Sequence, residues 1–429
     1  MSGIALVGAF LLLILIGVPI AFVIAIVAFL GILAIPYIPE ITVPMKMFNG
    51  LNSFVLLAVP LFILAANLMN HGKISQKLIE FSIAIVGHIR GGLAHSNILV
   101  SMIFAGVSGS STADTAGVGK ILIPNMIENG YDKETAVGVT AASSTIGVII
   151  PPSIPMIVYA GLTNAPISSL FLGGIVPGVL IGLGMMTVVY IRALKRGYPK
   201  YEKASREKFF KLLYESFPAL LTPVIIIGGI ITGWYTPTEA AAFASLYAFF
   251  ISMFFYKTLK VKDIPMILVE TLTLSSLSLF ALASASALGE LLGYYRVATL
   301  AEQFFTTYIT EGWIFMSIVI AFFLFVGTFM DAIPAMILFV PVLLPVALTL
   351  GISPVVLGLV TVITLAIGLV TPPYGLCLLI ASTIGKLSIE RSFSAVIPYI
   401  AVVLVVLMLV AFFPDVVFFI PKLMNPQFL

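Results

Sequence analysis

Hydroxyl and carboxylate side chains gather in two short stretches of a chain that is otherwise strongly apolar. The first, 106-GVSGSSTADTAGVGK-120, carries three serines and Asp114 among glycines. The second, 327-GTFMD-331, is a shorter version that ends on Asp331. Oxygen atoms of these kinds are the ligands that hard cations take in proteins, and a serine or a pair of acids can also cleave bonds. The elements that hold these side chains decide between the two chemistries.

The composition is that of a membrane protein. Of 429 residues, 61% are hydrophobic and 9% are charged, against about 25% charged residues in a soluble domain. Several uncharged runs are as long as the roughly 20 residues that cross a bilayer as a helix, and they are continuous, whereas barrel strands alternate. These runs are 1–39, 217–238, 312–330, 332–385 and 392–414. We therefore expect an all-α polytopic protein in the lipid bilayer, and the net charge of +3 gives no sign of nucleic-acid binding.

Several kinds of site are excluded by residues that are missing. The single cysteine, Cys377, allows neither an intrachain disulfide nor a cysteine-based zinc site. No GxxxxGK[ST] motif occurs, so the chain cannot hydrolyse ATP by a phosphate loop. The first uncharged run is too long for a signal peptide, and we interpret it as a first membrane helix bent at Gly17 and Pro19.

Basic residues give the orientation. Eight of the 21 lysines and arginines lie between Arg192 and Lys211, so this segment is expected on the cytoplasmic side. Two spans, about 217–233 and 239–256, then leave and return. They place the lysines of 257–262 on the same side.

The chain contains an internal duplication. Matching segments lie 218, 217 and 221 residues apart, which indicates two copies of one unit. The matched pairs are 61-LFILA-65 with 279-LFALA-283, Asp114 with Asp331 (each followed ten residues later by a proline), and 146-IGVIIPP-152 with 367-IGLVTPP-373.

The two copies are expected to have opposite orientations. Counting spans back from the basic segment, residues 95–130 begin and end on the cytoplasmic side. Counting forward from 257–262, residues 311–351 begin and end on the other side. Inverted repeats are typical of secondary transporters, which bind substrate and ions near the middle of the membrane where the repeats meet.

Each copy is predicted to contain a re-entrant hairpin and a broken helix. Glycines permit the turn inside the membrane, and hydroxyl groups bond to the loosened backbone. Consecutive prolines at 151–152 and 372–373 remove backbone donors, so each helix breaks and exposes carbonyl oxygens. The tip and the break together form a pocket for a hard cation, while the hairpin helix N-termini favour an anionic substrate. Asp114 and Asp331 could each cap a helix or bind the ion, and both interpretations stay open.

We divide the chain into six parts. Segments 73–90 and 297–308 are interpreted as interfacial arms beside the two hairpins. The parts are 1–60, N-terminal scaffold helices; 61–191, the first repeat; 192–216, a basic cytoplasmic loop; 217–263, a scaffold helix pair; 264–393, the second repeat; and 394–429, a C-terminal helix.

Two other functions were considered as alternatives. The segment 106-GVSG-109 matches the GxSG signature of intramembrane serine proteases, but His71, His88 and His95 all precede Ser108, whereas such enzymes need a later histidine. Intramembrane aspartyl proteases carry their catalytic acids in settings such as GxGD, whereas Asp114 and Asp331 lie in TADTA and FMDAI. An ion channel would be a symmetric oligomer of short pore segments, and two inverted hairpins in one chain favour alternating access. We therefore predict a protein that is not an enzyme.

Five long motifs, in this order, resemble the large membrane subunit of tripartite ATP-independent periplasmic (TRAP) transporters. They are 106-GVSGSSTADTAGVGKILIPNM-126, 128-ENGYDKETA-136, 147-GVIIPPSIPMIVYA-160, 327-GTFMDAIPAMILFVPVLLP-345 and 368-GLVTPPYG-375. The resemblance implies an elevator-type, sodium-driven importer in the bacterial inner membrane, without an organic cofactor. It also implies a small membrane subunit of the DctQ kind and a periplasmic binding protein that delivers an organic acid. Sialic acid is favoured over a C4-dicarboxylate.

The same resemblance implies two or more Na+ ions at the junctions of hairpin and broken helix. Asp114 and Asp331 support these sites or bind in them. The first site takes Ser108, Ser110 and Ser111 with Gly147, Val148 and Pro151. The second takes Gly327 and Thr328 with Thr364, Gly368, Thr371 and Pro372.

Overall fold

The computed structural model describes residues 3–309 and 311–424, and over these ranges it is helical with no β-strand. In chain order the α-helices are α1 (Gly3–Leu15), α2 (Ile20–Leu33), α3 (Thr42–Leu51), α4 (Ala58–His71), α5 (Ile74–Val86), α6 (Gly92–Ser108), α7 (Ser111–Glu128), α8 (Lys133–Ser144), α9 (Ile154–Thr163), α10 (Ile167–Arg196), α11 (Arg206–Ile231), α12 (Pro237–Phe250), α13 (Ile264–Tyr294), α14 (Val297–Tyr308), α15 (Gly312–Gly327), α16 (Ala332–Thr349), α17 (Pro354–Gly368), α18 (Leu376–Gly385), α19 (Ile389–Phe412) and α20 (Asp415–Met424). Four short elements are η1 (Phe54–Leu57), η2 (Thr145–Val148), η3 (Ile251–Phe255, a π-helix) and η4 (Val261–Asp263).

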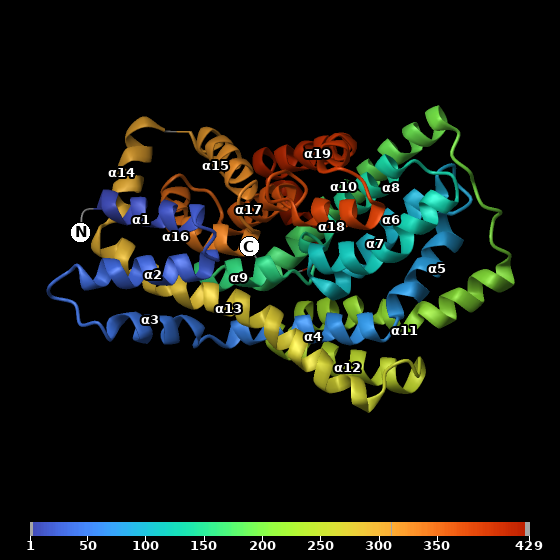
Figure 1. Cartoon of the computed structure of the whole chain (residues 1–429), viewed down its shortest axis with the longest axis horizontal. Coiled ribbons are helices and arrows are strands. Elements are labelled where there is room, and N and C mark those ends of the chain that lie inside the picture. Colours follow the sequence, from blue (N-terminus) through green and yellow to red (C-terminus); the bar gives the residue numbers. More distant parts are fainter. Residues whose placement is uncertain (1–2, 310, 425–429) are drawn as a thin grey trace.

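Seven helical segments within those ranges are long and apolar enough to cross a membrane. Other apolar helices are shorter, and apart from α2 they belong to the hairpins and broken helices that the sequence predicts. Figure 1 shows the hairpin α6–α7 entering from one end of the molecule and the hairpin α15–α16 entering from the other, with both tips near the centre. The inverted pair of re-entrant hairpins predicted from the repeat is therefore present.

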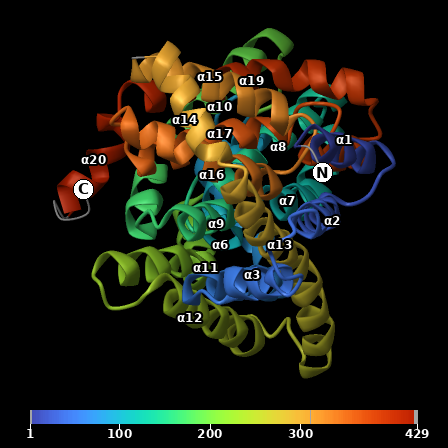
Figure 2. The same ribbon diagram turned by 90° about the vertical axis from the view of Figure 1, so that its left-hand side faces the viewer.

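A second layer of helices lies beside the hairpins. Figure 2 shows α3, α11 and α12 in the lower part of the view and α15, α17 and α19 in the upper part, with the long α13 slanting from the centre to the bottom. Within this layer, hydroxyl groups of α12 and η3 donate hydrogen bonds to carbonyl oxygens of η1 and α4 and so connect the two segments. These bonds are Thr238 Oγ1 to Phe54 O (2.8 Å), Ser245 Oγ to Leu61 O (2.6 Å) and Ser252 Oγ to Leu68 O (3.2 Å). Repeated bonds of this kind fix the register of two helices that apolar packing alone would leave free to slide.

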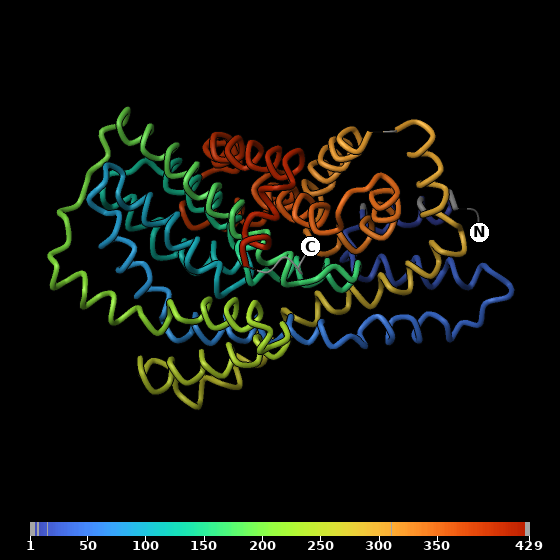
Figure 3. The backbone as a smooth tube through the Cα atoms, turned by 180° about the vertical axis from the view of Figure 1, so that it is seen from behind, coloured from blue at the N-terminus to red at the C-terminus, as the bar shows by residue number. Residues whose placement is uncertain are grey.

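The basic segment is shorter as a loop than predicted. We predicted a loop over 192–216, but α10 continues to Arg196 and α11 begins at Arg206. Ser205 caps α11 by accepting a hydrogen bond from the backbone N–H of Lys208 (3.2 Å), and basic side chains are good helix formers, so both helices extend past the apolar residues. Figure 3 shows the remaining connection, 197–205, at the end of the molecule opposite the N-terminus.

Both ends of the chain also differ from the prediction. The first uncharged run forms two short helices, α1 and α2, that pack against each other, because Gly17 takes a left-handed conformation (φ 89°) and Pro19 follows it. The predicted C-terminal helix 394–429 begins earlier, at Ile389, and is divided into α19 and α20 by Pro414. Residues 425–429 of that prediction lie outside the described residues.

The connection 197–205 holds the base of the first hairpin. Gly91 N donates to Pro199 O (3.2 Å), and Tyr201 N donates to Gly87 O (3.0 Å). Asp132 caps α8, forms an ion pair with Arg196 (2.7 Å) and accepts a hydrogen bond from the Tyr198 hydroxyl. Burial raises the pKa of Asp132, but the bonds from Tyr198 and Thr135 and the charge of Arg196 outweigh it and hold the pKa below its ordinary value.

Candidate ion and substrate site

The tip of the first hairpin lies against the first broken helix. Gly109 ends α6 in a left-handed conformation (φ 60°), which a residue with a side chain rarely takes. Its carbonyl oxygen accepts a long hydrogen bond from Ile154 N (3.4 Å), at the start of α9. A Cβ atom at Gly109 would lie 2.9 Å from the Pro152 carbonyl oxygen. The glycine therefore permits the close approach of tip and break.

The break between α8 and α9 exposes the backbone as the two prolines predict. The helix tightens into η2 over Thr145–Val148, and α9 begins only at Ile154. Ser153 caps α9 by accepting from Met156 N (3.3 Å), and its hydroxyl donates to Val148 O (2.6 Å). One predicted ligand, the Val148 carbonyl oxygen, thus already accepts one hydrogen bond and keeps a second lone pair.

Asp114 is fully buried behind this tip and does not cap α7. Ser110 is the N-cap of that helix, and its hydroxyl accepts a long bond from Ala113 N (3.5 Å). One carboxylate oxygen of Asp114 accepts a hydrogen bond from the Ser108 hydroxyl. The other, Oδ2, has no hydrogen-bond partner among the residues that the structure describes, and neither has the buried Ser111 Oγ.

Gly147, from the break, faces the same carboxylate. A Cβ atom at this position would overlap Asp114 Oδ2 and would lie 3.4 Å from Ser111 N. The glycine therefore lets the carboxylate lie close to the backbone of the break. Buried polar atoms in proteins are nearly always paired, so the two oxygens at this junction that lack a partner among the described residues indicate a site that a cation could complete.

The second junction repeats the contact of tip and break. Gly327 and Gly368 touch through their backbones, since a Cβ atom at Gly368 would overlap the Gly327 carbonyl oxygen. Thr328 O accepts from Tyr374 N (2.9 Å), in the non-helical segment between α17 and α18. Pro372 lies in that segment and is partly exposed.

Hydroxyl groups of the second junction bond to their own helices. Thr328, Thr364 and Thr371 donate to the carbonyl oxygens of Phe325 (2.7 Å), Val360 (2.6 Å) and Ile367 (2.8 Å). Asp331 is the N-cap of α16 and accepts from Ala332 N (2.7 Å). The carboxylate that matches Asp114 in the repeat therefore caps a helix, which was one of the two interpretations.

A cavity of about 520 Å³ lies between the two tips and the scaffold. The hairpins contribute hydroxyl groups of 108–112 and the Asp331 carboxylate, and α4 and α13 close the opposite side with Asn67 and Ser278. No lysine, arginine or histidine lines it among the residues that the structure describes. A small organic acid could bind here through backbone N–H groups and hydroxyls, at the N-termini of α7 and α16.

Two residues on the scaffold side of this cavity were missed by the sequence reasoning. Asn67 donates from its side chain to Thr271 Oγ1 (3.0 Å) and so joins α4 to α13. A single asparagine in the apolar segment 58–69 was the available signal, because amides are costly in lipid. Ser278 directly precedes the repeated 279-LFALA-283 motif, but a serine in an apolar helix more often bonds to its own backbone.

The geometry disfavours a serine protease. Ser108 donates to Asp114, whereas His95 lies 13 residues earlier on the same helix, about 20 Å away along its axis. A base must lie within about 3 Å of the nucleophile. No cluster of three or more His, Cys, Asp or Glu side chains suited to a metal occurs within 3–309 and 311–424.

Comparison with known proteins gives the family. Residues 7–416 match the family model described as the DctM component of tripartite ATP-independent periplasmic transporters. The chain belongs to this family. It is 39% identical over 378 residues to the sialic acid TRAP transporter large permease protein SiaM of Vibrio cholerae, covering 88% of each chain. It is 34% identical over 439 residues to the C4-dicarboxylate large permease DctM of Rhodobacter capsulatus, covering 99% of this chain and all of the relative.

The fold of this TRAP large permease also occurs in a more distant transporter. The crystal structure of the Alcanivorax borkumensis YdaH transporter matches with a TM-score of 0.62 at 12% sequence identity, covering 87% of each chain. At this identity the match shows the fold alone. Together with the apolar helices, the family makes the chain a multi-pass protein of the bacterial inner membrane and a transport component, as the motifs predicted.

Proposed function

We propose that this TRAP large permease imports an organic acid by sodium coupling, with one Na+ ion at each hairpin junction. The observation that carries the proposal is that two buried side-chain oxygens of the first junction, Asp114 Oδ2 and Ser111 Oγ, have no hydrogen-bond partner within 3–309 and 311–424. A carboxylate buried without a cationic partner is costly, and a bound cation offsets that cost. Sodium takes oxygen ligands of the kinds found here, and inverted-repeat transporters hold it at such helix breaks.

The ligands proposed for the first ion are Ser108, Ser110 and Ser111 with carbonyl oxygens of Gly147, Val148 and Pro151, and Asp114 now joins them as a direct ligand. For the second ion they are Gly327, Thr328, Thr364, Gly368, Thr371 and Pro372. The threonine hydroxyls donate to carbonyl oxygens, so their lone pairs remain free to bind a cation. Asp331 supports the second site as a helix cap.

The proposed substrate is a carboxylate with hydroxyl groups, and sialic acid is favoured over a C4-dicarboxylate. The described residues that line the central cavity offer a carboxylate, hydroxyls and an amide but no basic side chain. A second negative charge on the substrate would face Asp331 at low dielectric, whereas hydroxyl groups could donate to it. The relative named for sialic acid is also more similar to this chain than the Rhodobacter relative named for C4-dicarboxylates.

The transport movement is proposed to be an elevator, in which the hairpins and broken helices move together against the scaffold of α4, α11, α12 and α13. Support comes from the cavity, which lies between these two groups of helices. The name of the family describes a tripartite system, so the proposed partners are a small membrane subunit and a periplasmic binding protein that delivers the substrate.

The test is uptake by the complete system. The chain, its small subunit and its binding protein are placed in liposomes, and labelled sialic acid or succinate is supplied with an inward sodium gradient or with choline. We expect sialic acid uptake that requires sodium. Uptake that is equal in choline would contradict sodium coupling, and preferred uptake of succinate would contradict the choice of substrate only.

A further inference from the structure

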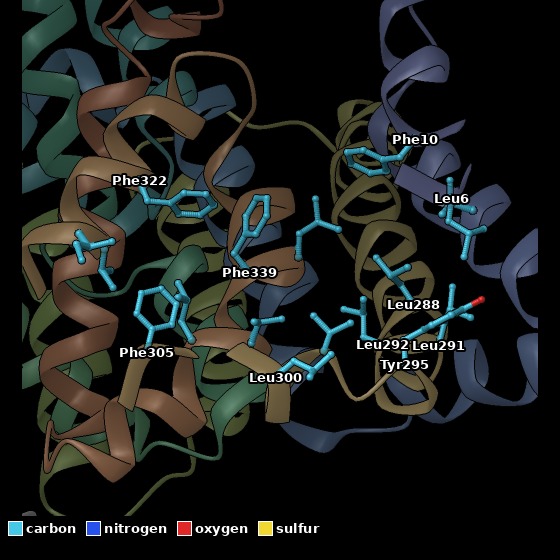
Figure 4. Close-up of a pocket in the computed structure, with 17 residues that line it drawn as sticks. Leu6, Phe10, Leu288, Leu291, Leu292, Tyr295, Leu300, Phe305, Phe322 and Phe339 are labelled. Atoms are coloured by element: carbon cyan, nitrogen blue, oxygen red, sulfur yellow. The ribbon is translucent and has the colours of Figure 1, made fainter. Parts of the chain in front are cut away.

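A second cavity, of about 690 Å³, differs from the central one in its chemistry. Its walls are aliphatic and aromatic apart from the hydroxyl of Tyr295. Figure 4 shows Phe10, Leu288 and Leu291 on one wall and Phe322 and Phe339 towards the other. An organic anion would lose its hydration in this cavity without gaining polar contacts, so the cavity is unsuited to the transported substrate.

The cavity lies where the N-terminal helices and α13 meet the second hairpin. Leu6 and Phe10 of α1 and Val27 of α2 line it together with the last turns of α13. The opposite wall comes from α15 and α16, and α14 closes one end. The helices α13 and α16 belong to candidate membrane spans, and α2 and α15 are shorter apolar helices, so the cavity is at the depth of the lipid chains.

An apolar space of this size is not stably filled by water and is unfavourable when empty. Apolar cavities stay dry, and their walls lose dispersion contacts if nothing fills them. The abundant apolar molecule at this depth is the acyl chain of a phospholipid. A chain that enters the cavity would bury methylene groups against the leucine and phenylalanine side chains.

One end of the cavity carries the features of a membrane surface. The candidate span that contains α13 ends at Tyr294, next to Tyr295 in the cavity wall. Arg296 follows, is exposed, and makes no ion pair with any side chain in 3–309 or 311–424. Tyr308 and Trp313, at the end of α14 and the start of α15, are also exposed, as aromatic side chains at a bilayer interface commonly are.

We propose that this cavity binds one acyl chain of a bilayer phospholipid whose phosphate lies beside Arg296. The apolar walls and the single guanidinium at one end match the two parts of such a molecule, and an anionic headgroup such as phosphatidylglycerol fits best. The proposal concerns a site separate from the central cavity and does not depend on sodium coupling.

Photolabelling of the unmodified chain gives the first test. The full chain is placed in bilayer nanodiscs with a trace of phosphatidylglycerol that carries a diazirine halfway along one acyl chain. We expect labelled peptides from 288–300 and 338–343, at least several-fold above the exposed apolar face of α12, and competition by unlabelled phosphatidylglycerol. Labelling of 288–300 and 338–343 that is no stronger than labelling of the exposed face of α12 would overturn the proposal.

Substitutions locate the two ends of the lipid. Val342→Trp fills the cavity and is expected to reduce labelling of 288–300 at least fivefold, whereas Val269→Trp, on an exposed face of α13, is the matched control and leaves it unchanged. Arg296→Asn suits the left-handed backbone there (φ 50°) and should reduce labelling about fivefold, while Arg296→Lys should retain it. Labelling that is unchanged in both Val342→Trp and Arg296→Asn would overturn the proposal.

Discussion

The two hairpin junctions share a backbone plan and use their carboxylates differently. In each, a glycine-bearing tip touches a helix broken at two prolines. Asp114 and Asp331 match in the repeat, yet Asp331 caps α16 while Asp114 lies one turn inside α7. Ser110 has taken over the cap in the first hairpin. Asp114 is therefore left with one oxygen bonded to Ser108 and one without a partner in the described part of the chain.

This difference shows that a repeat can preserve a residue while its role changes. The first tip has serines at 108, 110 and 111, which provide both the cap and the partner of Asp114. The second tip, 327-GTFMD-331, has no serine, so the acid itself must satisfy the first backbone N–H groups of its helix. We infer that charge is essential at Asp114 and replaceable at Asp331.

The largest expected difference between the two junctions follows when the charge of each carboxylate is removed. Asp114→Asn should reduce sodium-dependent uptake by about 10-fold to 100-fold, because a hydrogen bond or ion contact to a buried charge contributes about 1.5–3 kcal/mol. Asp331→Asn should change the half-saturating sodium concentration less than twofold, since asparagine is also a good N-cap. Uptake in proteoliposomes at varied sodium measures both. Equal losses in the two variants would remove the distinction between the junctions.

Alanine substitutions at the glycines of the two breaks should have different effects, one mainly on sodium binding and the other mainly on the stability of the fold. Gly147→Ala meets a carboxylate that can rotate, so it should raise the half-saturating sodium concentration with a modest loss of stability. Gly368→Ala meets the Gly327 backbone, which cannot move independently, so it should destabilise the fold by about 1–3 kcal/mol.

Gly228→Ala is the matched control for both, because nothing lies within 4 Å of a Cβ atom there. It should stabilise α11 by up to about 1 kcal/mol. Thermal unfolding in detergent, with sodium or with choline, compares the three variants. A Gly368→Ala protein as stable as the control would show that the second junction is not tightly packed.

Hydroxyl deletions are expected to have smaller effects of similar size at the two junctions. Ser110→Ala and Thr371→Ala each remove one proposed ligand and should weaken sodium activation several-fold. Ser110→Ala also removes a cap, at about 1 kcal/mol of stability, whereas Thr371→Ser retains the hydroxyl and serves as a control. Sodium titrations of uptake provide the measurement. Unchanged sodium activation in both alanine variants would refute these ligands while leaving the fold intact.

The smallest effect concerns the bases of the two repeats, where Asp132 caps α8 and the matching Ser353 caps α17. The folded-state pKa of Asp132 is lowered, so its contribution to stability is present above the unfolded pKa of about 3.9 and is lost as the pH falls through the folded value. Asp132→Asn keeps the cap but loses the charge, and should cost less than about 1 kcal/mol near pH 7. The difference between the unfolding midpoints of the variant and the wild type should be smaller at pH 2 than at pH 7. A difference of equal size at both pH values would exclude the charge as its cause.

Much of the fold could be predicted from the sequence because membrane helices, double prolines and basic loops act locally. The segments 151–152 and 372–373 break their helices as predicted, and both glycine-bearing tips lie against them. The ends of α10 and α11 could not be predicted, since polar residues that are good helix formers extend a helix past its apolar part.

The roles within the candidate site were harder to predict. Whether an acid caps a helix depends on where that helix begins. The helix α7 begins three residues before Asp114 and α16 begins directly after Asp331, yet the two acids look equivalent in the aligned repeats. The scaffold side of the cavity, with Asn67 and Ser278, depends on the packing of α4 against α13, which no motif encodes.

The central claim is that a cation completes the first junction through Asp114. Thermal unfolding of the purified chain in sodium chloride and in choline chloride of equal concentration, for the wild type, Asp114→Asn and Asp331→Asn, tests it most directly. A bound ion stabilises by about 2.7 kcal/mol when it is 100-fold above its dissociation constant. We predict stabilisation by sodium in the wild type and Asp331→Asn and a clear reduction in Asp114→Asn. Equal sodium stabilisation in all three proteins, or none in the wild type, would contradict the claim.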